Sequence, residues 1–104
     1  MKKETKYIIT IGLLKSDMKT NIKEKYALNI VSKELIKNDI IGFKVDLKSN
    51  GFYNGIQEKN LIVSFINTYN IKTKQIIKIV RTLKQELNQE CILLEKEKVL
   101  YQFV

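Results

Sequence analysis

Two runs of consecutive apolar residues constrain the fold of this chain most. Residues 6–14 (KYIITIGLL) and 61–66 (LIVSFI) are rich in β-branched side chains, and such runs predict strands that are buried on both faces in the middle of a sheet. Residues 41–47 instead alternate apolar residues with polar or small ones, which indicates a half-exposed strand near a sheet edge. Ser49-Asn50-Gly51 follows as a predicted turn.

Two other segments have the spacing of helices. The first prediction covers residues 22–38, with Asn21 and Glu24 as a capping box. The second covers residues 74–89, with Thr73 as its cap. The apolar positions that define them are Ala27, Ile30, Val31 and Leu35 in the first helix, and Ile76, Ile77, Val80, Leu83 and Leu87 in the second.

The last apolar segment, residues 91–94, is predicted to be a strand. Residues 95–98 (EKEK) either continue it as an exposed stretch or turn it into a final hairpin strand over residues 99–104. The resulting order is β-α-β-β-α-β. It predicts an α+β class, ferredoxin-like fold in which an antiparallel sheet carries two helices on one face.

We expect residues 1–104 to form a single domain, because the chain has no repeat, linker or low-complexity segment. The sheet face opposite the helices would remain open, although the central strands are apolar on both sides. Self-association through this face is the simplest cover, so a homodimer is expected. An aromatic loop that packs back over the face is the alternative.

Composition limits the chemistry that is available. With no His and one Cys, the chain can build neither a structural zinc site nor a His-based triad. We expect no metal and no cofactor, and we interpret Cys91 as a small core residue rather than a nucleophile. Met1-Lys2-Lys3 and the apolar residues 7–14 faintly resemble a signal peptide, but the run is only eight residues long, has no small-residue cleavage site and is followed by Lys15 and Asp17. No apolar run is long enough to span a membrane. The expected location is therefore the cytoplasm, that of the host cell if the chain is phage-encoded.

Charge suggests the class of partner. The chain has 19 Lys+Arg against 11 Asp+Glu, a net charge of +8, and this balance favours nucleic acid, a nucleotide or an acidic protein surface. The alternative is the codon bias of an AT-rich genome. The predicted second helix carries a basic ridge, for which phosphate contact and a solvated helix face are the two interpretations. Its members are Lys74, Lys78, Arg81 and Lys84.

A short aromatic segment between two glycines is the second candidate binding feature. Phe52 and Tyr53 could stack on a planar ligand, with Asn50 and Asn54 as amide donors. The alternative is a hairpin connection whose aromatic residues cap the open sheet face. RNA-recognition domains share this order of elements, but the Gly-aromatic pattern that they place on the third strand is missing here.

Three stretches together resemble a family of uncharacterised small proteins of bacteria and phages. They are residues 51–55 (GFYNG), 58–63 (EKNLIV) and 83–94 (LKQELNQECILL). The resemblance spans most of the chain but consists of fold-forming residues. It implies a ferredoxin-like domain with a phage or mobile-element origin, and no particular activity.

The leading hypothesis is a non-enzymatic, phage-derived protein that binds an anionic ligand: nucleic acid, a nucleotide or a nucleoprotein effector. It could act as a counter-defence inhibitor, such as an anti-CRISPR or a signal-sequestering protein. The alternative is a small dimeric enzyme or metabolite-binding domain with a pocket between sheet and helices. Replacement of Lys78 and Arg81 by Glu discriminates between them, because only the first hypothesis depends on the ridge.

Overall fold

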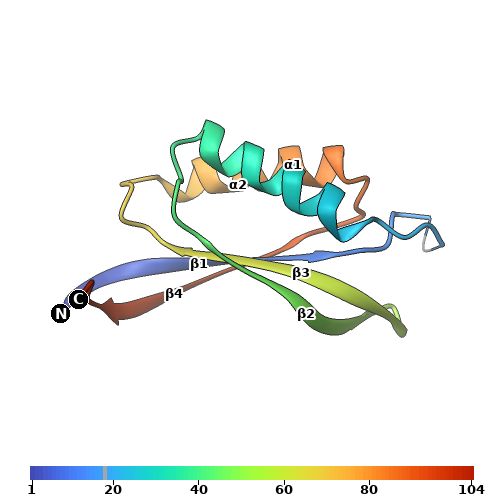
Figure 1. Ribbon diagram of the computed structural model, residues 1–104, viewed down its shortest axis with the longest axis horizontal. Helices are drawn as coiled ribbons and strands as arrows, with labels where there is room; N and C mark the ends of the chain where they lie inside the picture. The colour runs from blue at the N-terminus through green and yellow to red at the C-terminus, as the bar shows by residue number, and fades with distance from the viewer. Residues whose placement is uncertain (18) are drawn as a thin grey trace.

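The chain folds into two layers, a four-stranded sheet and a pair of helices (Figure 1). The computed structural model describes residues 1–17 and 19–104. At residue 48 it describes the backbone but not the side chain. No helix in this described part is long and apolar enough to cross a membrane. The elements are β1 (Lys2–Gly12), α1 (Glu24–Lys37), β2 (Lys44–Tyr53), β3 (Ile56–Ile66), α2 (Thr73–Glu86) and β4 (Leu93–Tyr101).

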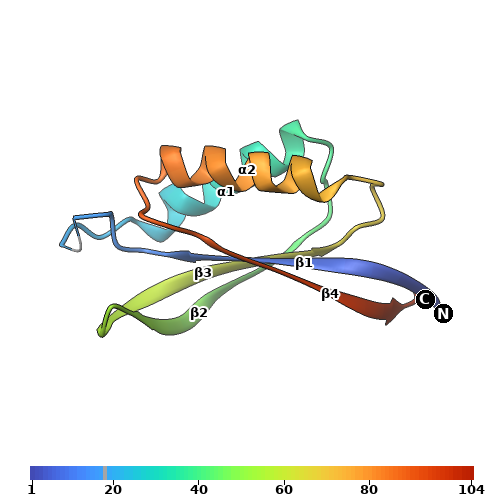
Figure 2. The same ribbon diagram turned by 180° about the vertical axis from the view of Figure 1, so that it is seen from behind.

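The sheet has the strand order β2-β3-β1-β4, and every neighbouring pair is antiparallel. The two apolar runs lie in the central strands, residues 6–12 in β1 and residues 61–66 in β3, as predicted. The alternating segment is in the edge strand β2 only from Lys44 onward, because residues 41–43 precede that strand. Both helices cover the same side of the sheet, and the other side is left open (Figures 1 and 2). This arrangement confirms the ferredoxin-like class inferred from the order of elements.

The core lies between the helices and one face of the sheet. Alternate residues of the central strands are buried there, among them Ile9, Ile11, Leu61 and Val63, each with no exposed surface. The residues between them, such as Ile8, are only partly buried. The prediction of strands buried on both faces is therefore wrong for the single chain. The expected homodimer remains a prediction.

The helix starts differ from those predicted. α1 begins at Glu24, after Lys23, and Asn21 instead forms a β-bridge with Leu14. α2 begins at Thr73, whose hydroxyl shares a hydrogen bond of 2.7 Å with the Tyr7 hydroxyl. Both predicted caps are therefore wrong. At Thr73 the competing partner is a tyrosine of β1, which the sequence pattern does not reveal.

The buried side of α2 also departs from the prediction at one position. Ile79 is buried, whereas Ile77 keeps 38% of its surface exposed. The buried residues of this helix are Ile76, Ile79, Val80 and Leu83.

The hairpin between β2 and β3 corrects the predicted turn. Ser49, Asn50 and Gly51 belong to β2, which continues through a change of register after Asp46. The chain reverses at Asn54 and Gly55, whose φ angles are 50° and 77°. Two residues with positive φ between the paired Tyr53 and Ile56 make the turn that suits a twisted hairpin. Figure 1 shows this hairpin bending away from the helices.

The last strand resolves the two alternatives for the C-terminal segment. β4 runs without interruption from Leu93 to Tyr101, so residues 95–98 continue the strand. Cys91 precedes the strand and is exposed, which contradicts its assignment to the core. Lys2 pairs with Tyr101, so the two termini lie next to each other at one end of the sheet (Figure 1).

Candidate ligand pocket on the open sheet face

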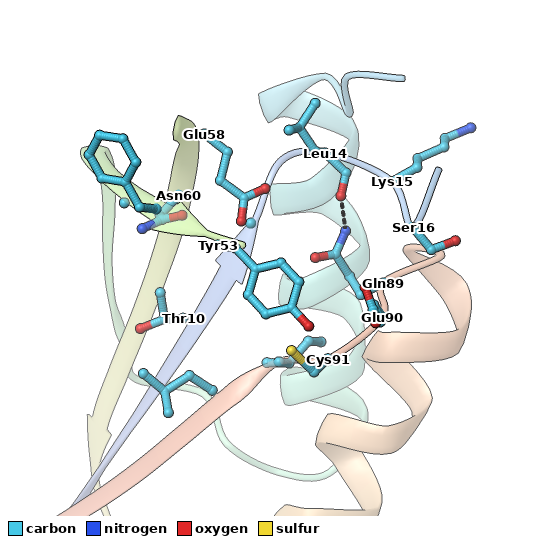
Figure 3. A pocket seen from close by; sticks show the side chains of 15 residues that line it. Thr10, Leu14, Lys15, Ser16, Tyr53, Glu58, Asn60, Gln89, Glu90 and Cys91 are labelled. Atoms are coloured by element: carbon cyan, nitrogen blue, oxygen red, sulfur yellow. Dashed lines mark hydrogen bonds between the residues drawn. The ribbon is translucent and has the colours of Figure 1, made fainter. Parts of the chain in front are cut away.

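A cavity of about 440 Å³ lies on the open side of the sheet, at the end where the β2–β3 hairpin turns (Figure 3). Thr10, Gly12 and Asn60 contribute to it from strand positions that alternate with the buried ones. Cavities of this size are large enough for small-molecule ligands. The remaining lining residues are Leu14, Lys15, Ser16, Gly51, Phe52, Tyr53, Glu58, Gln89, Glu90, Cys91, Ile92 and Leu93.

Glu58 is the partly buried carboxylate of this pocket. It lies on β3 opposite Gly51, and its carboxylate packs directly against Gly12. A Cβ atom on residue 12 would come within 2.2 Å of the Glu58 Oε1 atom, so the position of the carboxylate requires a glycine there. Burial raises the pKa of Glu58, and a hydrogen bond from the Leu14 backbone N–H partly opposes this shift.

Tyr53 approaches the segment before β4 from the other side of the pocket. In Figure 3 its hydroxyl points toward Cys91 and Glu90, and its ring lies beside the Glu58 side chain. The hydrogen bond with the Cys91 side chain, followed by desolvation and by the charges of Cys91 and Glu90, raises the pKa of Tyr53. The phenol therefore stays protonated and is available as a hydrogen-bond donor.

Gln89 holds two walls of the pocket together. Its side chain is 9% exposed, and its Nε2 donates a hydrogen bond of 2.8 Å to the Leu14 carbonyl (Figure 3). Next to it, the Ser16 backbone N–H donates to the Asn88 carbonyl, and the Ser16 hydroxyl donates to the Asn88 side chain. The segment after β1 is thereby fixed to the end of α2.

The pocket is acidic in a basic protein. Two carboxylates, Glu58 and Glu90, line it against one lysine, Lys15, although the whole chain has a net charge of +8. Among the described residues, no three His, Cys, Asp or Glu side chains come together to hold a metal ion. Carboxylates beside the aromatic ring of Tyr53 suit a ligand that combines a cation with a planar group.

The structure brings together only some of the residues singled out in the sequence. Phe52 and Tyr53 line the pocket, whereas Asn54 lies in the hairpin turn. Asn50 lines a different depression, beside the start of α1. The basic ridge is exposed on α2, in the helix layer, and none of its members lines the pocket. These members are Lys74, Lys78, Arg81 and Lys84.

No motif in the sequence assigns Glu58 or Gly12 to this site. Glu58 and Gly12 are far apart in the chain and meet only because β1 and β3 are paired with Gly12 opposite Asn60. The available signal was Asn54-Gly55, a two-residue hairpin turn that predicts strand residues on both sides and so places Glu58 in β3. The pocket is also on the sheet face opposite the helices, not between sheet and helices as the alternative hypothesis expected.

The sequence matches no described protein family and no curated protein. Solved structures do match. A phage SAM lyase in its apo state aligns with a TM-score of 0.69 and 15% identity, over 92% of this chain and 81% of that one. A phage SAM lyase in complex with S-methyl-5'-thioadenosine aligns with a TM-score of 0.65 and 16% identity, over 90% and 80%. At these identities the likeness shows a shared fold.

Proposed function

We propose that this protein is a small enzyme that binds S-adenosylmethionine (SAM) and cleaves it to S-methyl-5'-thioadenosine (MTA). The acidic, aromatic pocket of a basic protein carries the proposal, because its charge suits a cationic ligand. The shared fold with phage SAM lyases supports it. Of the two hypotheses from the sequence, we therefore favour the alternative, a small enzyme, over the leading one, a non-enzymatic protein that binds an anionic ligand.

The pocket offers a complement to the two cations and to the adenine ring of SAM. The sulfonium and the ammonium group are cations, and Glu58 and Glu90 are the carboxylates available to them. The adenine ring is planar and apolar on its faces, and the Tyr53 ring, which lies beside Glu58, offers it an aromatic surface. A phosphate ligand would instead meet two negative charges here.

The reaction needs a folded substrate. Breaking the bond between sulfur and the methionine side chain passes its electron pair to sulfur, which becomes the neutral thioether of MTA. The remaining four-carbon fragment is balanced when its own carboxylate closes on the carbon that sulfur leaves. Holding the substrate in the conformation that brings this carboxylate to that carbon is the contribution of the pocket.

Cleavage of SAM would also account for the counter-defence role that we expect from the sequence. A protein that consumes SAM removes the methyl donor that methyltransferases of a host cell require. Such an effect is catalytic and small-molecule based, so it needs no complex with a defence protein. It differs in this respect from an anti-CRISPR inhibitor that occupies its target.

Chromatography of SAM incubated with the purified chain tests the proposal. We expect MTA to accumulate, and Glu58→Gln to slow its release by about 100-fold, the loss of about 2.7 kcal/mol of transition-state stabilisation. Glu95→Gln is the matched control, since this exposed glutamate of β4 lies opposite Ile8, outside the pocket. Binding of SAM without formation of MTA would contradict the enzymatic step. Absence of both would contradict the whole proposal.

A further inference from the structure

The outward side of the helix layer forms a second, oppositely charged surface. We propose that it binds the phosphate backbone of double-stranded DNA. We call it the helix surface and define it by five exposed side chains: Lys25 and Lys33 of α1, and Lys74, Lys78 and Arg81 of α2. This binding would be a function separate from cleavage of SAM, because none of these five residues lines the pocket. Both helices lie on one side of the sheet (Figure 2).

The buried side of each helix determines that these residues point outward. In α2 the buried residues include Ile76, Val80 and Leu83, and Lys74, Lys78 and Arg81 lie on the opposite side at spacings of four and three residues. In α1 the buried residues are Ala27, Val31 and Leu35, and Lys25 and Lys33 point away from them. Each helix therefore presents its basic residues to solvent, away from the sheet.

The two basic rows run along helices that are in contact with each other. Packed helices lie about 8–10 Å apart, and side chains as long as lysine extend that separation when they spread outward. The major groove of B-DNA separates its phosphate rows by about 12 Å. Along α2, Lys74, Lys78 and Arg81 follow one another at about 6 and 4.5 Å. This spacing lets one helix follow one strand of the duplex.

The basic residues of the helix surface are not paired with carboxylates in the described part of the chain. Its helices contain three acidic residues, Glu24, Glu34 and Glu86. Among the described side chains, no ion pair involves a basic residue of the helix surface; the one that is found joins Lys6 and Glu97 on the sheet. These cations are therefore free to exchange small counterions for phosphates, which is the main driving force of non-specific binding to DNA.

The composition of the surface favours duplex DNA over a single strand. Single strands are bound through aromatic side chains on which the bases stack, and Tyr26 is the one aromatic residue of the two helices. Arg81 is the one arginine of the chain, so the surface lacks the several guanidinium groups that sequence-specific proteins use to read bases. Binding should therefore depend on charge and groove shape and be independent of sequence.

Fluorescence anisotropy with a labelled mixed-sequence duplex tests this inference. At about 50 mM NaCl we expect saturable binding that weakens with salt, with a log–log slope of about −4 for four to five contacted phosphates. Lys78→Glu with Arg81→Glu should weaken binding at least tenfold and reduce the slope by about two. The matched control is Lys2→Glu with Lys44→Glu, two exposed lysines of the strands that carry the same change in charge, from +8 to +4.

We expect the control pair to weaken binding by less than about threefold, because long-range charge alone is screened by salt. Equal losses in the two pairs would show that net charge, and not the helix surface, binds the duplex, and would overturn the proposal. Tighter binding of the unpaired strand, or no binding at low salt, would overturn it as well. Release of MTA by the same variants separates a failure here from a failure of the proposed enzyme.

Discussion

The pocket and the helix surface differ in sign although they belong to one small basic protein. The pocket has two carboxylates and one lysine, whereas the helix surface has five cations without an ion-pair partner in the described part of the chain. Net charge therefore has the sign of the helix surface and not that of the pocket. It led from the sequence to an anionic ligand, which suits the helices, while the concave site that a small molecule would enter is acidic.

The largest expected effect separates the two regions by function. Glu58→Gln should reduce release of MTA by about 100-fold and leave the affinity for duplex DNA within twofold, because Glu58 is on the opposite layer from the helix surface. The measurement is a pair of assays on one protein preparation. A parallel loss of both activities would show that the two regions are one site or that the variant is misfolded.

A smaller effect is expected at Gly12. Its substitution by Ala would push the Glu58 carboxylate away, since the new Cβ would come within 2.2 Å of it. We expect about a tenfold lower kcat/KM for SAM, the effect of misplacing one binding group. Gly55→Ala is the control: it strains a residue with φ of 77° and should cost about 1 kcal/mol of folding free energy without changing kcat/KM.

The pH dependence should distinguish the regions too. Binding of a cation requires ionised Glu58, whose pKa is raised by burial above the ordinary 4.5. Affinity for SAM should therefore fall as the pH is lowered through this raised pKa. The five residues that define the helix surface are lysines and an arginine and include no carboxylate. Duplex affinity measured between about pH 7 and 5 should not fall, and a parallel decline would contradict the assignment of Glu58.

The hydrogen bond between Tyr7 of β1 and Thr73 of α2 joins the two layers. Its loss should lower the free energy of unfolding and leave both proposed activities unchanged. We expect Tyr7→Phe to lower the free energy of unfolding by about 1 kcal/mol, as measured by urea denaturation. In a double-mutant cycle with Thr73→Val, the interaction energy between the two positions should account for most of that loss. A change in MTA release or in duplex affinity would mean that the regions communicate through this contact.

The smallest effect concerns the stability of the pocket itself. A raised pKa means that the folded state favours the protonated Glu58, so the ionised form lowers the stability at neutral pH. Glu58→Gln should therefore slightly raise the melting temperature at pH 7. The difference should vanish below about pH 4, where the carboxyl is protonated in both states. A destabilised variant at pH 7 would indicate a structural role for the carboxylate.

The architecture could be predicted because its signals are local. Apolar runs mark β1 and β3, alternation marks the edge strand β2, and helical spacing marks α1 and α2. The wrong predictions concern residues whose contacts or exposure depend on how distant segments pack together. Thr73 pairs with Tyr7 instead of capping its helix, and Cys91 is exposed because β4 begins after it, at Leu93.

The site could be predicted only in part, because it depends on how the strands pair. Phe52 and Tyr53 stood out as aromatics between glycines, and both line the pocket. Glu58 is one acid among eleven in the sequence and becomes distinctive only through its contact with Gly12. A glycine in a strand indicates close approach of another group, but it does not name that group.

The pairing of Lys2 with Tyr101 has a practical consequence for the architecture of derived proteins. Adjacent ends can be joined by a short linker, so a circular permutant that opens at Asn54-Gly55 should retain the sheet. Eight residues of β1 separate Lys2 from Thr10, the first residue of this strand that lines the pocket, which is about 27 Å at the rise of a strand. A reporter domain fused to either terminus would thus stay clear of the ligand, which makes this small fold suitable as a modular sensor.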